Sequence, residues 1–186
     1  MAEDQRFILH RAIVLVGMMG CGKTAIGRAL SARLGVPFLD SDAEIEAAAN
    51  ATIAEIFARD GEPFFRDREA EVIARLLAGP ACVLSTGGGA FLAPRNRAAI
   101  AAAGLAVWLD APLPLLWERV RHKETRPLLQ TPDPLGTLTR LFHERTPIYR
   151  LAGLRIAVQP GASIEQTTAD VIAALRDQPD ILETAA

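Results

Sequence analysis

The sequence is poor in the residues that disulfide-bonded and zinc-binding proteins require. It holds two cysteines, Cys21 and Cys82, and three histidines that lie far apart along the chain. Two cysteines cannot build a disulfide framework, and no cluster of cysteine and histidine has the spacing of a zinc site. We therefore expect a protein of a reducing compartment, the cytoplasm, that folds without such cross-links.

Long apolar runs are missing as well. No stretch approaches the roughly 20 apolar residues that a membrane-spanning helix needs. The opening segment, Met-Ala-Glu-Asp-Gln-Arg, lacks the basic start and the apolar stretch of a signal peptide. These absences predict a protein with no membrane partner.

An excess of positive charge is also lacking. Lysine and arginine number 20 against 22 aspartate and glutamate, and the net charge is −2 at pH 7. Because binding to a phosphate backbone needs the opposite balance, we expect no nucleic-acid partner. Lysine is especially scarce, since 18 of the 20 basic residues are arginine and only Lys23 and Lys123 are lysine. A lysine here is a candidate for a specific chemical role, although for Lys123, in a polar stretch, chance placement is the simpler interpretation.

Strand-like and helix-like patterns alternate along the chain. Its 186 residues, half of them hydrophobic, suffice for one domain with its own core. Apolar runs predict five strands, at residues 8–16, 37–39, 82–84, 105–109 and 154–158. Helices are predicted at residues 24–34, from 41, at 52–60, 63–78, from 94, at 114–122, 135–146 and 164–176. Capping patterns mark the starts of three of them, at residues 41–44, 52–55 and 163–166.

This alternation predicts the fold class. Strands separated by helices imply right-handed crossovers between parallel strands. The expected fold is therefore α/β, a three-layer α/β/α arrangement around a five-stranded parallel sheet, in a single domain over residues 1–176. Residues 177–186 are expected to form a flexible C-terminal tail. In such sheets, ligands bind beyond the carboxyl ends of the strands.

A glycine-rich segment follows the first predicted strand. Residues 17–24 read Gly-Met-Met-Gly-Cys-Gly-Lys-Thr and match the phosphate-binding pattern G-x-x-x-x-G-K-[ST] between a strand and a helix. Backbone N–H groups of such a loop face phosphate oxygens, and the helix N-terminus adds partial positive charge. Lys23 would meet the phosphoryl group in transfer, and Thr24 would bind Mg²⁺. ATP is expected to contact the end of this loop, at Gly20, Cys21, Gly22, Lys23, Thr24 and Ala25.

The loop favours a small-molecule kinase over other classes. A glycine turn that only joins strand to helix is the alternative, but it does not account for a lysine in so lysine-poor a chain. A GTPase would need a guanine-reading Asn-Lys-x-Asp segment, which the sequence lacks.

Cys21 lies inside this loop. The helix N-terminus and Lys23 favour a thiolate at Cys21 beside the phosphates, and the alternative is a thiol that points into the core.

Acidic residues end the second predicted strand. Asp40 and Asp42 point in similar directions, so that one could hold a magnesium-bound water and the other could meet an acceptor hydroxyl. Asp42 could instead cap the next helix, or Ser41 could be that cap and leave Asp42 free.

Arg66 has an acidic neighbour on the same predicted helix. Glu69 lies three residues after Arg66 and could hold its guanidinium, although a plain surface pair would show the same spacing.

Three further segments are candidates for binding. The glycines at 87–89 follow a buried strand, where they permit close approach to a ligand or form a simple flexible turn. Residues 123–134 form the only long aperiodic segment, which predicts a mobile lid with Arg126 as its phosphate-seeking cation. Arg145 and Arg150 follow, and exposed surface charge is the simpler interpretation of Arg150.

The sequence resembles the shikimate kinase family. The resemblance covers most of the chain and is carried by six segments in order: the phosphate loop, Asp-x-Asp at 40–42, Gly-Glu-x-x-Phe-Arg at 61–66, Gly-Gly-Gly at 87–89, Arg-Pro-Leu-Leu at 126–129 and Arg-x-Pro-x-Tyr at 145–149. It implies ATP:shikimate 3-phosphotransferase activity, which makes shikimate 3-phosphate on the chorismate route to the aromatic amino acids. It also implies a P-loop kinase fold of the nucleoside-monophosphate-kinase type with a mobile lid.

The resemblance further implies roles for individual residues. Thr24 and, through water, Asp40 would hold Mg²⁺, with help from Ser85. Arg119 would lie against adenine, and Arg126 would act with the loop lysine on the transferring phosphoryl group. The implied catalytic residues are Lys23, Asp42 and Arg126. Shikimate would be held by Asp42, Arg66, Gly88, Gly89 and Arg145, with Asp42 on the ring hydroxyls and the arginines on the carboxylate.

Two alternatives remain at this point. Gluconate is also an anionic hydroxy acid, so a gluconate kinase or another small-molecule P-loop kinase would need a similar set of groups. A non-catalytic ATP-binding regulator belongs to a different class, and it would not need Arg126 and Asp42 together. Because no second domain is predicted, we expect a monomer.

Overall fold

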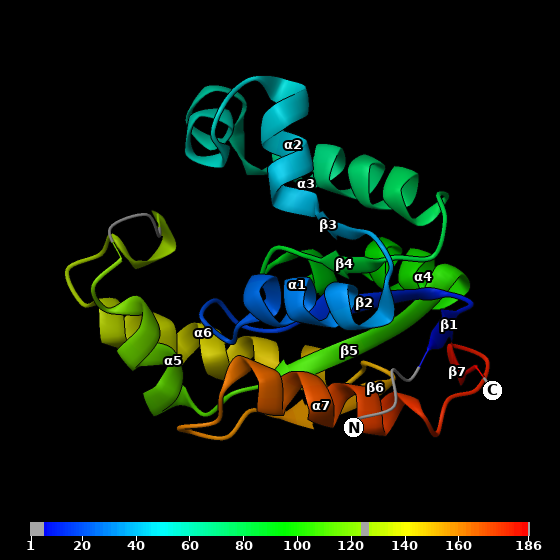
Figure 1. Ribbon diagram of the computed structural model, residues 1–186. Helices are drawn as coiled ribbons and strands as arrows, with labels where there is room; N and C mark the ends of the chain where they lie inside the picture. Colours follow the sequence, from blue (N-terminus) through cyan, green and yellow to red (C-terminus); the bar gives the residue numbers. More distant parts are fainter. Residues whose placement is uncertain (1–5, 124–126, 186) are drawn as a thin grey trace.

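A five-stranded parallel sheet forms the centre of the molecule. The structure, a computed structural model, describes residues 6–123 and 127–185 (Figure 1). The strand order is β3-β4-β2-β5-β6, and every neighbouring pair is parallel, as expected. The strands are β2 (Ala12–Val16), β3 (Phe38–Asp40), β4 (Val83–Ser85), β5 (Gly104–Asp110) and β6 (Leu154–Ala157). The middle strand β2 is buried along its whole length, which fits an apolar strand covered on both faces.

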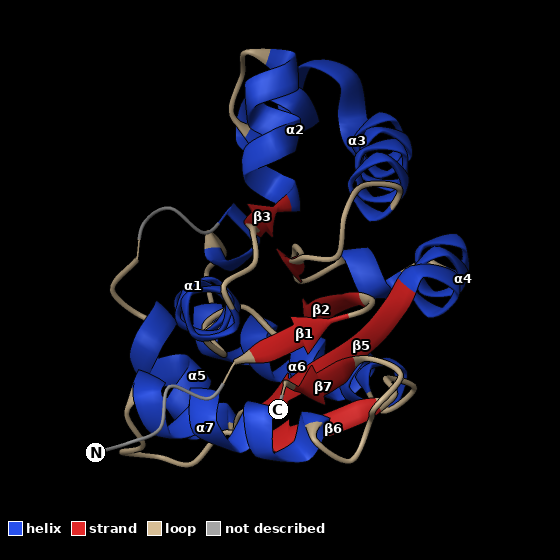
Figure 2. Cartoon of the chain, turned by 45° about the vertical axis from the view of Figure 1, so that its right-hand side comes forward, coloured by secondary structure: helices blue, strands red, loops and turns tan. Residues whose placement is uncertain are grey.

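Helices cover both faces of this sheet. Helices α1 (Lys23–Leu34) and α7 (Ile164–Leu175) pack against each other on the front face in Figure 1, and α4 (Pro94–Ala103) and α6 (Pro134–Tyr149) lie behind it. Helices α2 (Ser41–Ala49) and α3 (Ile53–Leu77) pair with each other, and Figure 2 shows α2 beyond the β3 edge of the sheet. The short helix α5 (Leu113–Val120) follows β5 at its carboxyl end. The three-layer α/β/α prediction is confirmed.

The two ends of the described chain form a small second sheet. Strand β1 (Phe7–Leu9) pairs antiparallel with β7 (Leu182–Thr184). The single strand expected at 8–16 is therefore two strands in different sheets, separated at residues 10 and 11. The expectation of a flexible tail is wrong for residues 177–185, because Ile181 and Leu182 are buried in the main core. Among the described residues, no helix has both the length and the apolar character needed to cross a bilayer.

Helix α3 carries a break where the sequence predicted one helix to end. Thr52 and Glu55 form a capping box at its start, as expected. Gly61 then has φ 84° and ψ 169°, a conformation that is nearly exclusive to glycine, and helix resumes around Pro63. The break changes the direction of α3 just before Arg66, so this glycine helps to set where the second half of the helix places its side chains.

Replacement of Gly61 by alanine should destabilise the protein. We expect Gly61→Ala to lower the free energy of unfolding by about 1–3 kcal/mol, because a Cβ is strained at this φ and ψ. Gly35→Ala is the matched control, since Gly35 also has a positive φ, of 67°, but in the milder left-handed helical region with nothing within 4 Å of the added Cβ. Urea denaturation of both variants measures the difference, and equal losses would contradict the role given to Gly61.

Candidate active site

The phosphate loop lies between β2 and α1, where the sequence placed it. All three of its glycines have positive φ: Gly17 at 142°, Gly20 at 82° and Gly22 at 102°. The Lys23 ammonium donates hydrogen bonds to the carbonyl oxygens of Gly17, at 2.8 Å, and Met18, at 3.0 Å. The lysine therefore folds back over the loop that it follows, and its charge lies at the loop's centre.

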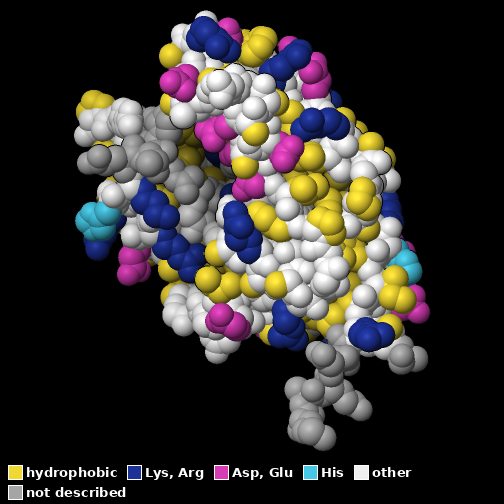
Figure 3. Space-filling view, turned by 45° about the horizontal axis from the view of Figure 1, so that its top comes forward, with side chains coloured by type: hydrophobic (Ala, Val, Ile, Leu, Met, Phe, Trp, Pro, Cys, Tyr) yellow, Lys and Arg dark blue, Asp and Glu magenta, His cyan; other side chains and the backbone are white. Residues whose placement is uncertain are grey.

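A cavity of about 480 Å³ opens beside this loop at the carboxyl edge of the sheet. Acidic and basic side chains gather around the hollow in the space-filling view (Figure 3). Candidate residues named from the sequence line it: Gly20, Gly22, Lys23, Thr24, Ala25, Asp40, Asp42, Ser85, Gly87, Gly88 and Arg119. Segments that are far apart in sequence thus meet at one site, as the predicted sheet requires.

The Cys21 side chain does not face the cavity. It is completely buried and belongs to the hydrophobic core, and it lies beneath the loop, with its sulfur 3.0 Å from the position that a Cβ on Gly17 would take. The thiol was expected beside the phosphates, and the structure instead has the alternative orientation, into the core. Only the backbone of Cys21 is available to a nucleotide.

A hydroxyl and a carboxylate meet at the start of α1. Thr24 Oγ1 donates to Asp40 Oδ2 at 3.3 Å. The other Asp40 oxygen accepts from the backbone N–H groups of Asp42, at 3.0 Å, and Ala43, at 3.2 Å. Asp40 is therefore the N-cap of α2, in place of the Ser41 cap considered from the sequence. These bonds fix the carboxylate and leave one oxygen directed at Thr24.

This pair fits Mg²⁺. The cation takes oxygen ligands, and in nucleotide sites it usually has one or two from the protein and the rest from phosphates and water. Thr24 and Asp40 supply such a pair, and Ser85 lies next to Asp40 in the parallel register of β3 and β4. Within residues 6–123 and 127–185 there is no group of three or more histidine, cysteine, aspartate or glutamate side chains that could hold an ion by themselves.

Asp42 is set apart from Asp40 by its surroundings. Burial raises the pKa of Asp42 to about 6, and the negative charges of Asp40 and Glu69 add to the increase, while Lys23 opposes it. Its Oδ1 atom is buried and has no hydrogen-bond partner among the described residues. A carboxylate in this state is suited to accept a hydrogen bond or a proton from a bound hydroxyl.

The three glycines at 87–89 each face one charged side chain. A Cβ built on these glycines would lie 2.7 Å from Asp42 Oδ1 at Gly87, 3.4 Å from Arg145 Nη1 at Gly88 and 2.5 Å from Arg66 Nη2 at Gly89. A larger residue at position 87 or 89 would take the space that Asp42 or Arg66 occupies, whereas at position 88 the distance to Arg145 is that of an ordinary van der Waals contact. The turn therefore presents a bare backbone surface on which Asp42, Arg145 and Arg66 converge.

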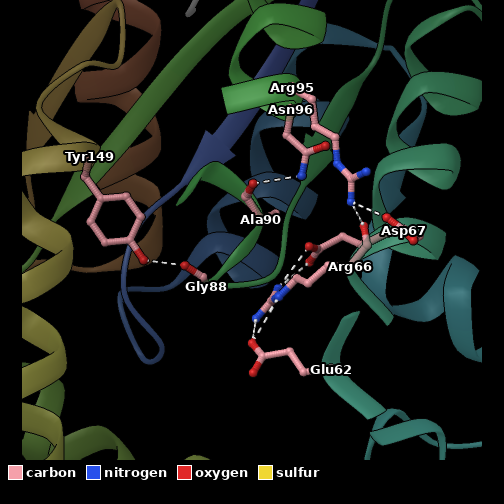
Figure 4. Close-up of polar contacts among 9 residues, drawn as sticks. Glu62, Arg66, Asp67, Gly88, Ala90, Arg95, Asn96 and Tyr149 are labelled. Atoms are coloured by element: carbon pink, nitrogen blue, oxygen red, sulfur yellow. Dashed lines mark hydrogen bonds and ion pairs between the residues drawn. The ribbon is translucent and has the colours of Figure 1, made fainter. Parts of the chain in front are cut away.

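Arg66 is held by two acidic residues. Its Nη1 donates to both oxygens of Glu69, at 3.1 Å and 2.9 Å, and Glu62 accepts from the same guanidinium at 3.3 Å (Figure 4). The Glu69 side chain is only 1% exposed, and burial raises its pKa while Arg66 acts in the opposite direction. The pair is thus not the surface pair that its spacing also allowed.

Arg145 brings a second guanidinium to the turn from helix α6. It is 7% exposed, and its Nη1 is buried without a hydrogen-bond partner in the part of the chain that the structure describes. An unpaired cationic N–H group in a nearly dry site is costly, so an anion placed there would be bound strongly.

The lid side of the site is described only in part. Arg126 lies outside the described residues, so its expected role stays a prediction, as does the mobility of the lid at 123–134. Arg119 on α5 donates to the carbonyl oxygen of Gly20 at 3.1 Å and lines the cavity. Lys123 also lines the cavity, so the interpretation of its position as chance placement is wrong. The scarcity of lysine was the signal that could have found it, because both lysines of the chain lie at this one site.

The last part of the chain also contributes to the cavity. Residues after β6 and around the start of α7, which carry only a short adenine-side resemblance at Gln159 and Pro160, also line the cavity: Val158, Ala162, Ser163, Ile164 and Thr167. Ser163 caps α7 in a capping box with Gln166, as its sequence predicted. A phosphate loop that borders a cavity with acidic and basic side chains, on a parallel sheet with this topology, defines a small-molecule kinase of the P-loop class.

Comparisons with known proteins give the family. The shikimate kinase family model matches residues 19–176. A shikimate kinase of Ruegeria pomeroyi is 63% identical over 175 residues, which cover 94% of this chain and 90% of that protein. The solved shikimate kinase of Acinetobacter baumannii in complex with shikimate is 40% identical, with a TM-score of 0.85 over 90% of this chain and 94% of the other. The chain belongs to the shikimate kinase family.

The gluconate alternative finds less support. A gluconokinase structure from Sinorhizobium meliloti has a TM-score of 0.58 over 91% of this chain and 94% of its own, but only 17% of residues are identical. That likeness shows a shared fold alone.

The elevated pKa of Asp42 predicts a pH-dependent effect on stability. The folded protein binds a proton on Asp42 more tightly than the unfolded chain does. Ionisation of Asp42 therefore lowers the free energy of unfolding. This loss is complete above about pH 6 and absent below the ordinary pKa of 3.8. Asp42→Asn should therefore raise the free energy of unfolding at pH 7.5 by about 1–2 kcal/mol, and the gain should shrink towards pH 4. Asp170→Asn, on the exposed surface of α7, serves as control. Denaturation curves at several pH values would reject the assignment if the two variants responded alike.

Proposed function

We propose that this protein transfers the γ-phosphoryl group of ATP to the 3-hydroxyl of shikimate. The observation that carries the proposal is the convergence of Asp42, Arg66 and Arg145 on the glycine turn beside the Lys23 loop. A hydroxy acid with one carboxylate needs cations for that carboxylate and an acceptor for its hydroxyls, and this set supplies both. Membership of the shikimate kinase family, with a relative solved in complex with shikimate, supports the same substrate.

On the nucleotide side, the loop residues would bind ATP. Backbone N–H groups and the N-terminus of α1 suit the phosphates, and Lys23 would neutralise charge as the phosphoryl group moves. Thr24 and Asp40 would hold Mg²⁺, which, when bound, neutralises the β- and γ-phosphate oxygens. Arg126 of the lid would add a cation to the same group, and Arg119 would lie against the adenine.

On the acceptor side, Arg66 and Arg145 would hold the shikimate carboxylate. Asp42 would accept a hydrogen bond from the reacting hydroxyl and then its proton. With a pKa of about 6, Asp42 is largely ionised at neutral pH and yet closer to the working pH than an ordinary aspartate. Because the transition state of phosphoryl transfer is loose, correct orientation of the hydroxyl would contribute as much as basicity.

The same proposal includes the wider setting of the enzyme. We infer a single kinase domain that extends beyond residue 176, because Ile181 and Leu182 pack in its core, with the lid at 123–134, acting as a monomer in the cytoplasm. The net charge of −2 supports the absence of nucleic-acid partners. Shikimate is then the only partner besides ATP and Mg²⁺.

ADP release tests the proposed reaction. Mixing the protein with ATP, Mg²⁺ and shikimate should release ADP and form a phosphorylated acid, and gluconate in place of shikimate should give little product. Asp42→Asn should bind ATP but lose most of the turnover, because the charge that receives the proton is gone. ATP binding without ADP release would favour the non-catalytic regulator, and preference for gluconate would refute the named substrate.

Two substitutions should separate acceptor binding from chemistry. Arg145→Ala should weaken shikimate binding by about 30- to 1000-fold and leave ATP binding nearly unchanged, because it removes a charge-assisted bond in a dry site. Lys23→Ala should instead lower kcat at least about 100-fold with little change in shikimate affinity. Calorimetric titration and steady-state kinetics distinguish the two patterns, and an exchange of these effects between the variants would show that the two subsites are assigned wrongly.

A further inference from the structure

Tyr149 carries a hydroxyl into the interior beside the glycine turn at residues 87–89. It is the only tyrosine of the chain and the last residue of α6, and it is fully buried. A buried hydroxyl lowers stability unless it is hydrogen-bonded. The Tyr149 hydroxyl donates to the backbone carbonyl oxygen of Gly88, 61 residues away in sequence (Figure 4).

The phenol ring is held in place from the side of the sheet. Trp108 of β5 stacks on it, with ring centroids 6.3 Å apart and an interplanar angle of 28°. The Arg155 guanidinium lies 5.6 Å from the Trp108 ring centroid and is itself bound to Asp110 at 2.8 Å. The position of the hydroxyl is therefore set by the packed core and does not depend on a bound ligand.

Helix α6 contacts Gly88 through two of its residues. Tyr149 binds the carbonyl oxygen, and Arg145, one helical turn earlier, has its Nη1 3.4 Å from the position that a Cβ on Gly88 would take. That nitrogen is the buried N–H group without a partner among the described residues. Gly88 thus lies between the hydroxyl of Tyr149 and the buried guanidinium nitrogen of Arg145.

We infer that Tyr149 is a positioning residue for the acceptor, which holds the Gly88 peptide at the spacing from Arg145 that the carboxylate of the substrate requires. This inference rests on the proposed function, since it takes the acceptor to be bound at Arg145. Gly87 and Gly89 face Asp42 and Arg66, so a shift of Gly88 would disturb those contacts too. The phosphate loop has its own bonds, from Lys23 to the carbonyl oxygens of Gly17 and Met18, and is affected less.

The hydroxyl is a donor and not a proton carrier. Burial raises the pKa of Tyr149 to about 12, while the nearby Arg145 acts in the opposite direction. The phenol therefore stays protonated across the range in which the enzyme works. Removal of the hydroxyl should change acceptor affinity without a change in the pH profile of kcat.

Tyr149→Phe provides the test. We expect the KM for shikimate to rise about 5- to 20-fold, as for loss of a buried hydrogen bond, with the KM for ATP and kcat within about twofold of wild type. Thr146→Val is the matched control, because it also removes a hydroxyl from α6, one that donates to Phe142 within the helix at 2.6 Å. It should leave both KM values unchanged.

Several outcomes would overturn the inference. These are an unchanged KM for shikimate in Tyr149→Phe, equal increases in both KM values, an altered pH profile of kcat, or an equal effect of Thr146→Val. Failure of the proposed function is distinct, because wild-type protein would then show no turnover of shikimate at all.

A measurement on the unsubstituted sequence covers the case in which the variant does not fold. Because the chain has one tyrosine, growth on 3-fluorotyrosine gives a single fluorine signal at position 149. Addition of shikimate should shift that signal more than addition of ADP does. The absence of a shikimate-induced shift, in protein shown to bind shikimate, would also reject the role of Tyr149.

Discussion

Charged groups without full sets of partners can stay in a nearly dry pocket only if the surrounding chain holds them there. Asp42 and Arg145 each keep a buried polar atom with no hydrogen-bond partner in the described part of the chain. Such groups lower the stability of the free protein, and packing elsewhere must offset the loss. The parallel sheet provides the rigid frame, because Leu15 of β2, Asp40 of β3 and Ser85 of β4 lie side by side near the carboxyl ends of their strands.

The glycine turn after β4 lets side chains from three different helices reach one point. Asp42 comes from α2, Arg66 from α3 and Arg145 from α6, and each contacts the turn at a residue that has no side chain of its own. The charged groups come close to the turn because its three glycines have no side chains, and not because their own side chains are unusually long. The break at Gly61 and the contact of Tyr149 with Gly88 set the positions of two of these helices relative to the turn.

Sequence patterns predicted the features that depend on neighbouring residues. The phosphate loop, the Thr52 and Ser163 capping boxes and the order of strands and helices all arise from local spacing. Features that depend on distant contacts were missed or left open. The Cys21 thiol turns into the core because of what packs beneath the loop, and Asp40 rather than Ser41 caps α2 while it also accepts a bond from Thr24. No local pattern reveals that Lys123 lines the cavity.

The pairing of β1 with β7 has a consequence for the order of folding. This ribbon joins Phe7–Leu9 to Leu182–Thr184, so it closes a loop of almost the whole chain and loses more chain entropy on formation than any other strand pair. Contacts of such sequence separation form late, after the parallel sheet has brought the two ends together. The ribbon has only three residue pairs and lies at the ends of the described chain, so local fluctuations open it more easily than the central parallel sheet. Native-state hydrogen exchange in this protein would then begin at the end of the molecule that takes no part in phosphoryl transfer.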